Sequence, residues 1–140
     1  MSIKQRESVE HIMTKQPISV NLTDDLNKVY HMMHENCIRH LPVVSGTKLI
    51  GILSKMDLER ISFTELDEKN QKIKSNFFTG YTIAQVMTKN VQSLQLEDSV
   101  KDAAETLSFG NFHAVPILDG DKLVGIVTST DVINYLLELY

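Results

Sequence analysis

Apolar residues recur at helical spacing in two stretches of the chain. Each set occupies positions i, i+3, i+4 and i+7, which marks one face of a helix. The sets are Leu26, Val29, Tyr30 and Met33, and then Val100, Ala103, Ala104 and Leu107. Thr23 or Asp24, and Asp98 in the second set, can accept hydrogen bonds from free amides at the helix start. Asn36 and Gly110 follow the helices and readily adopt the left-handed conformation that closes one.

A pair of continuous apolar runs follows each predicted helix. Residues 41–44 and 49–53 flank the turn dipeptide Ser45-Gly46, and residues 115–118 and 123–127 flank Asp119-Gly120. Each pair predicts a β-hairpin. Because these runs are apolar throughout, we expect both faces of the small sheet to be covered, by helices on one side and by the partner copy on the other.

The same hydroxyl and acid pattern opens a second helix after each hairpin. It reads Ser54-x-x-Asp57 in one place and Thr128-x-x-Asp131 in the other. A Ser or Thr followed three residues later by an acid is typical of a helix N-terminus. The predicted order in each half is therefore β-α-β-β-α, which is an α+β class.

The chain contains an internal repeat. A shift of 74 positions aligns residues 9–61 with 83–135 without a gap. We therefore expect one domain over 1–61, a connector over 62–82 and a second domain over 83–140. A copy of about 53 residues would be only marginally stable alone, so the copies are expected to pack face to face. In the connector, Phe77, Phe78 and Tyr81 are expected to attach its end to the core.

Composition and charge exclude several classes of protein. The net charge of −4 argues against a broad nucleic-acid-binding surface. The longest apolar stretches are far below the roughly 18 residues of a membrane span. The first residues, MSIKQRESVE, lack the apolar segment of a secretory signal, so a cytoplasmic location is expected. Cys37 is the only cysteine and is predicted to be a small core residue.

Catalytic and metal chemistry have little support in the sequence. The histidines fall on unlike predicted elements. His31 and His34, three residues apart on one helix, could provide two ligands of a metal site, but there is no obvious third ligand. Nothing assembles a nucleophile, a base and an orienting group, and neither glycine-rich phosphate-loop pattern occurs. We therefore expect no metal site, no catalytic residue and no enzymatic activity.

Four segments carry a family resemblance that covers nearly the whole chain. They are VEHIMT at 9–14, IRHLPVVSGTKLIGILSKMD at 38–57, IAQVMT at 83–88 and FHAVPILDGDKLVGIVTSTD at 112–131. Together they resemble the CBS (cystathionine-β-synthase) domain pair, also called a Bateman module. The resemblance implies a pseudo-twofold pair whose clefts between copies bind adenosine derivatives such as AMP, ADP, ATP or S-adenosylmethionine. It also implies a regulatory role without a required cofactor, a homodimer, and a regulated partner protein.

The resemblance also assigns roles to residues. It implies that Asp57 and Asp131 hold ribose hydroxyls, with Ser54 and Thr128 beside them. A carboxylate can accept both ribose hydroxyls, and helix N-terminal amides favour a nearby phosphate. On the local motif alone, a capping box that stabilises the helix without a ligand is the competing interpretation. The wall of each site opposite the Asp motif is expected in residues 14–19 and 88–93, which begin at Thr14 and Thr88. The two walls differ, because the first contains Pro17 where the second contains Val91.

The two predicted sites differ in charge. Arg39, His40 and Lys55 in the first copy align with His113, Ala114 and Ser129 in the second. Since the guanidinium of an arginine can give two parallel hydrogen bonds to a phosphate, the first site is predicted to favour the more phosphorylated ligand. Solvated surface charge is the alternative for Arg39 and Lys55. A ligand-free dimerisation scaffold is the alternative function, and the sequence does not identify the ligand or the partner.

Overall fold

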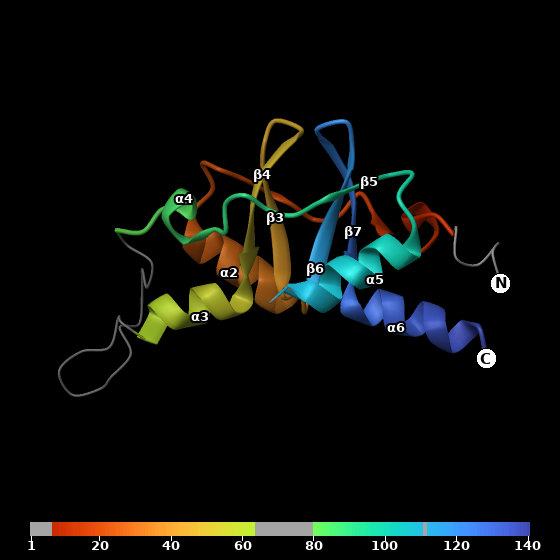
Figure 1. Ribbon diagram of the computed structural model, residues 1–140. Coiled ribbons are helices and arrows are strands. Elements are labelled where there is room, and N and C mark those ends of the chain that lie inside the picture. The colour runs from red at the N-terminus through yellow and green to blue at the C-terminus, as the bar shows by residue number, and fades with distance from the viewer. Residues whose placement is uncertain (1–6, 64–79, 111) are drawn as a thin grey trace. The chain divides into compact units, whose positions relative to one another are not determined.

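The computed structural model describes residues 7–63, 80–110 and 112–140, and it confirms the α+β class (Figure 1). In the first copy, strand, helix, hairpin and helix follow one another as predicted. The elements are β2 (Val20–Asn21), α2 (Leu26–Glu35), β3 (His40–Ser45), β4 (Lys48–Ser54) and α3 (Lys55–Phe63).

The second copy repeats this order. Its elements are β5 (Leu94–Gln95), α5 (Val100–Phe109), β6 (Ala114–Asp119), β7 (Lys122–Thr128) and α6 (Ser129–Glu138). Each copy begins with a short leading segment, 9–17 in the first and 83–91 in the second. The first copy has the 3₁₀ helix η1 (Val9–His11) and strand β1 (Thr14–Lys15), and the second has helix α4 (Ile83–Val86).

The chain forms two compact units whose boundaries differ from those of the sequence repeats. One unit comprises 18–46 and 50–91 and is called the 18–91 unit; the other comprises 1–17, 47–49 and 92–140 and is called the 92–140 unit. The leading segment of each copy thus belongs to the unit that holds most of the other copy. The domain boundaries expected from the repeat, 1–61 and 83–140, stay a prediction.

The core of the 18–91 unit lies between its sheet and helices α2 and α3. Strand β2 pairs in parallel with β3, which neighbours β4. On β4, Ile52 exchanges backbone hydrogen bonds of 3.1 and 2.9 Å with Thr88, which follows α4. The buried core residues are Val20, Leu26, Val29, Met33, Leu41, Val43, Leu53, Leu58 and Ile83. Ile83 comes from the leading segment of the second copy and is 1% exposed.

The 92–140 unit is built in the same way. Strand β5 pairs in parallel with β6, β6 pairs with β7 as an antiparallel hairpin, and β1 pairs with β7. Its buried core residues are Val9, Ala103, Val115, Ile117, Val127 and Val132. Val9 comes from the leading segment of the first copy and is fully buried. Each leading segment therefore completes the core that holds the other copy's hairpin.

Two glycines in the hairpins make this exchange sterically possible. A Cβ atom at Gly125 would stand 2.3 Å from Sδ of Met13, and one at Gly51 would stand 2.4 Å from Sδ of Met87. Real side chains do not approach so closely, so the methionine of each leading segment needs a glycine in the strand below it. This packing explains the Leu-x-Gly-Ile pattern that both copies share.

The helix starts lie one residue beyond the predicted caps. Asp25 caps α2 by accepting from the amide of Asn27 at 2.9 Å, and Ser99 caps α5. Asp24 and Asp98, which were predicted as caps, instead accept from the amides of residues 21 and 95 at 2.8 and 2.7 Å. These caps were wrong, as was Thr23, the alternative to Asp24, because Asp25 caps α2. Two adjacent acceptors compete at each helix start, and the first of them closes a turn.

The predicted helix ends were also wrong in detail. Asn36 has φ −95° and Gly110 has φ −97°, so neither is left-handed. The left-handed residue after α2 is Cys37, with φ 54°, and its side chain is exposed rather than in the core. The turn glycines Gly46 and Gly120 do adopt positive φ, at 67° and 70°, as hairpin turns require.

The expected connector is described only at its ends. Helix α3 extends through Phe63, and Tyr81 packs against the core of the 18–91 unit, as predicted. Phe77 and Phe78 lie outside the described residues. No helix in the described parts of the chain is long and apolar enough to cross a membrane.

Candidate functional site

Both Ser/Thr-x-x-Asp motifs stand at the start of a helix, as the sequence predicts. Ser54 ends β4, and its Oγ accepts a hydrogen bond of 3.0 Å from the amide of Asp57 in α3. Thr128 caps α6 in the same way, accepting from the amide of Asp131 at 3.2 Å. Each motif therefore stabilises its helix, whatever else it binds.

The two carboxylates have different partners. Oδ2 of Asp131 accepts from the amide of Thr128 at 2.8 Å, which completes a capping box. Oδ1 of Asp57 instead lies 3.2 Å from Nη2 of Arg60. A carboxylate offers about four acceptor positions, so each Asp keeps acceptor capacity for a ligand.

A cavity of about 270 Å³ lies beside Asp57 within the 18–91 unit. Among the described residues it is lined by Asp57, Arg60, Ile61, Gly80, Tyr81, Gln85 and Val86. The cavity thus combines a carboxylate, a guanidinium, an amide and apolar side chains. Its volume is close to the lower end, about 300 Å³, of typical small-molecule pockets.

The expected wall segments are placed next to the motifs of the opposite copy. Thr88 pairs with Ile52, two residues before Ser54, within the 18–91 unit. Thr14 pairs with Ile126, two residues before Thr128, within the 92–140 unit. Each unit therefore brings a leading segment of one copy alongside the strand that ends in the other copy's motif.

Both wall segments contain a residue in an unusual backbone conformation. Gln16 and Asn90 occupy equivalent repeat positions and have φ of 47° and 55°. Such left-handed residues other than glycine are uncommon and are concentrated at functional sites. Pro17 and Val91, the next residues, are both half-buried.

The predicted cationic set is partly assembled at the start of α3. The amide of Lys55 donates to the carbonyl of Arg39 at 2.8 Å, and His40 follows as the first residue of β3. In the second copy, the amide of Ser129 donates to the carbonyl of His113 at 2.9 Å. These hydrogen bonds hold residues 39 and 113 beside the first residues of α3 and α6, respectively. However, the described lining of the Asp57 cavity includes none of the cationic set.

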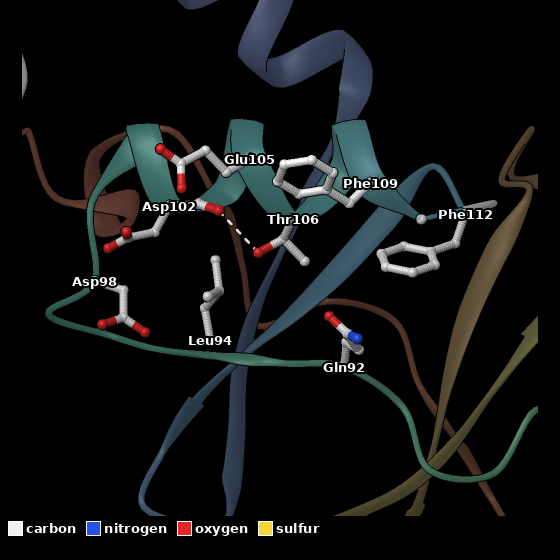
Figure 2. A pocket seen from close by; sticks show the side chains of 9 residues that line it. Gln92, Leu94, Asp98, Asp102, Glu105, Thr106, Phe109 and Phe112 are labelled. Carbon is white, nitrogen blue, oxygen red and sulfur yellow. Dashed lines mark hydrogen bonds between the residues drawn. The ribbon is translucent and has the colours of Figure 1, made fainter.

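A larger cavity, of about 550 Å³, lies in the 92–140 unit and contains none of the predicted site residues (Figure 2). Its described lining is Gln92, Leu94, Asp98, Asp102, Glu105, Thr106, Phe109, Gly110 and Phe112. Figure 2 shows the three acids toward one end and Gln92 with the two aromatic rings toward the other. No sequence pattern predicted this cavity, although its lining residues Gln92 and Phe112 are the sequence neighbours of two predicted site residues, Val91 and His113.

These observations agree with a comparison to protein families. The CBS domain family model matches residues 9–63 and 83–138, which is most of the chain. The chain belongs to the CBS domain family. The family resemblance and the tandem α+β fold predicted from the sequence are thereby confirmed.

Solved CBS structures share the fold of the whole chain. The AcuB protein of Vibrio cholerae is 29% identical, with a TM-score of 0.77 over 94% of this chain and 91% of that one. The CBS domain pair of protein MJ0100, solved with 5′-methylthioadenosine and S-adenosylmethionine, is 27% identical, with a TM-score of 0.77 over 95% and 98%.

Curated relatives are mostly much longer than this chain. A homoserine O-acetyltransferase of Methanococcus vannielii is 30% identical over 128 residues, which cover 90% of this chain and 24% of that protein. An uncharacterized protein of Methanocaldococcus jannaschii, MJ1404, is 27% identical over 98% of this chain and 34% of its own length. The CBS pair thus corresponds to about a quarter to a third of these two relatives.

No group of three or more His, Cys, Asp or Glu side chains suited to a metal ion occurs among the residues that the structure describes. The roles given to individual site residues stay predictions. The structure gives each a position in a CBS unit, and it adds Arg60 to the neighbourhood of Asp57.

Proposed function

We propose that this CBS pair is a regulatory module that binds an adenosine-containing ligand such as AMP, ADP, ATP or S-adenosylmethionine. The observation that carries the proposal is the cavity beside Asp57, at the start of a helix whose motif matches the ribose-binding pattern. The MJ0100 pair, which is 27% identical, was solved with two adenosine derivatives. The role is binding rather than catalysis, with no required cofactor.

The chemistry of the motif suits a nucleoside. The Asp57 carboxylate can accept hydrogen bonds from the ribose hydroxyls, and its side chain is only 19% exposed, which limits competition from water. Ile61 and Val86 line the same cavity and offer apolar contact to a base. The backbone of the wall segment around Thr88 would read the edge of that base.

The two proposed sites are unequal. The first copy carries Arg39, His40 and Lys55 near the start of α3, where the second carries His113, Ala114 and Ser129 near α6. In addition, Asp131 already uses one carboxylate oxygen in its capping box. The first site should therefore bind phosphorylated ligands more tightly than the second.

We further propose that occupancy is transmitted through a homodimer or a partner protein. On α6, residues at i, i+3, i+4 and i+7 form an apolar stripe, of which Ile133 is 55% exposed, Leu136 48% and Leu137 66%, and Tyr140 extends it beyond the helix. A second copy of the chain is the expected occupant, because one stripe packs on its own copy in an isologous twofold interface. Such transmission requires that the ligand bind two states with different affinity.

The second candidate function is a ligand-free dimerisation scaffold. The hydrogen bonds within Thr128-x-x-Asp131 favour it, because they account for the motif as a helix cap alone. The same exposed stripe on α6 would then be the functional surface. Ligand binding separates the two candidates.

The test is calorimetric titration with AMP, ATP, 5′-methylthioadenosine and S-adenosylmethionine. Light scattering measures the molecular mass of the protein with and without each compound. We expect at least one of these to bind and to raise the melting temperature. Asp57→Asn should weaken its binding about tenfold or more, because a charged acceptor is lost. Asp121→Asn, an exposed acid in the β6–β7 turn, is the matched control and should bind like the wild type. Failure of all four compounds to bind would favour the scaffold.

A further inference from the structure

Two groups of opposite charge line the same small cavity of the 18–91 unit. Nη2 of Arg60 lies 3.2 Å from Oδ1 of Asp57, one turn earlier on α3. The Asp57 side chain is 19% exposed and the Arg60 side chain 69%. The carboxylate is therefore held at the cavity wall, while the guanidinium keeps most of its surface toward solvent.

Among the described residues, this ion pair leaves most of the hydrogen-bonding capacity of Arg60 unused. A guanidinium carries five N–H donors in a planar fork, and the contact with Asp57 is a single one through Nη2. Because the guanidinium is 69% exposed and contacts Asp57 through Nη2, its remaining donors can face a ligand while that contact is kept. A phosphate is a suitable ligand, because its oxygens match the fork in a bidentate contact.

We propose that Arg60 makes the first-copy site selective for phosphorylated nucleosides. This inference rests on the proposed function: Asp57 accepts the ribose hydroxyls, and Arg60, from the same cavity, donates to the phosphate on the 5′ side. Arg60 thus supplies to the Asp57 cavity the cation that Arg39 and Lys55, absent from its described lining, do not.

The second copy offers a natural contrast. The position equivalent to Arg60 is Asn134, so the Asp131 motif has no guanidinium at this spacing. The larger cavity of the 92–140 unit is lined by three acids, and its described lining includes neither Lys nor Arg (Figure 2). Carboxylates repel a phosphate, so that cavity should not take a nucleotide by its phosphate end. The selectivity for phosphate therefore belongs to the first copy.

The experiment compares AMP with adenosine, which lacks only the phosphate, by calorimetry on the full chain. The wild type should bind AMP more tightly than adenosine. Arg60→Gln should weaken AMP about tenfold and leave adenosine within about twofold, which removes the preference for phosphate. Arg60→Lys, which keeps the charge but loses the fork, should fall between. Lys28→Gln removes one exposed positive charge from α2 of the same unit and should leave both affinities unchanged.

Several results would overturn the inference. Equal weakening of AMP and adenosine in Arg60→Gln would mean that Arg60 only orients Asp57. Loss of the phosphate preference in Arg39→Gln, with Arg60→Gln unaffected, would move the phosphate to Arg39. In both cases adenosine compounds still bind, so the proposed function survives. Binding of neither compound to the wild type, while 5′-methylthioadenosine or S-adenosylmethionine still binds, would overturn the inference alone. Failure of every adenosine compound to bind would overturn the proposed function as well. Thermal unfolding without ligand verifies that each variant is folded.

Discussion

The exchange of leading segments predicts that one residue of the second repeat stabilises the core of the first. Ile83 precedes most of the second copy in sequence, yet it is 1% exposed within the core of the 18–91 unit. Ile83→Ala should therefore destabilise α2, β3 and β4 rather than the elements of its own repeat.

The magnitude follows from the burial of the side chain. The substitution removes three carbon atoms, worth about 0.8 kcal/mol each in transfer free energy, or about 2.4 kcal/mol. The unfilled cavity adds to this, and buried Ile→Ala changes cost about 2–5 kcal/mol in total. We expect a loss of about 3 kcal/mol in the free energy of unfolding. Ile18→Ala makes the same change in the same unit at a residue that is 45% exposed, and by the same transfer free energy should cost only about 1.3 kcal/mol.

Urea unfolding monitored by circular dichroism measures the loss, and native-state hydrogen exchange shows where it falls. Amides of α2 and β3 should lose protection in Ile83→Ala, while those of α5 and β6 keep more of theirs. The reasoning is refuted if Ile83→Ala costs no more than Ile18→Ala. It is equally refuted if protection is lost first in α5 and β6, because Ile83 would then support its own repeat.

Two further predictions concern glycine and left-handed positions. Gly125→Ala should cost about 1–3 kcal/mol in chemical denaturation, because the three atoms nearest to an added Cβ all belong to Met13. Adding Met13→Ala to this variant should recover part of the loss; no recovery would contradict this packing. Cys37→Gly should raise the free energy of unfolding by up to about 1 kcal/mol, because Cys37 is left-handed at φ 54°. Asn36→Gly should lower the free energy of unfolding, since Asn36 is not left-handed and its side chain donates to the carbonyl of Met32 at 2.8 Å. If Asn36→Gly melted at a higher temperature than Cys37→Gly, the left-handed residue would be Asn36 and this prediction would be wrong.

Local patterns predicted the elements well because each depends on residues close in sequence. The i, i+3, i+4, i+7 spacing located α2 and α5, and the Gly turns located both hairpins. The Ser/Thr-x-x-Asp motif located the starts of α3 and α6 for the same reason. Caps were less predictable, since Asp24 and Asp25 are both good acceptors and only the folded turn selects between them.

Pairings over long distances were not predictable from the repeat. Val9 and Ile83 occupy equivalent repeat positions and are both apolar, so the sequence does not say that each joins the core of the opposite hairpin. The repeat also carries no signal for Arg60, because the equivalent residue is Asn134 and the two copies do not share a charge at this position. A charged residue three positions after Asp57, on the same helix face, was the available clue.

The exchange of segments also connects the proposed binding to the proposed regulation. The chain passes from one compact unit to the other after Pro17 and after Val91, which are equivalent repeat positions, and also on either side of residues 47–49. The passages after Pro17 and Val91 lie in the expected ligand walls, one residue after the left-handed residues Gln16 and Asn90. A ligand that contacts these walls would therefore restrain the backbone where the units are joined. The proposed regulation would then begin at these two covalent links between the units.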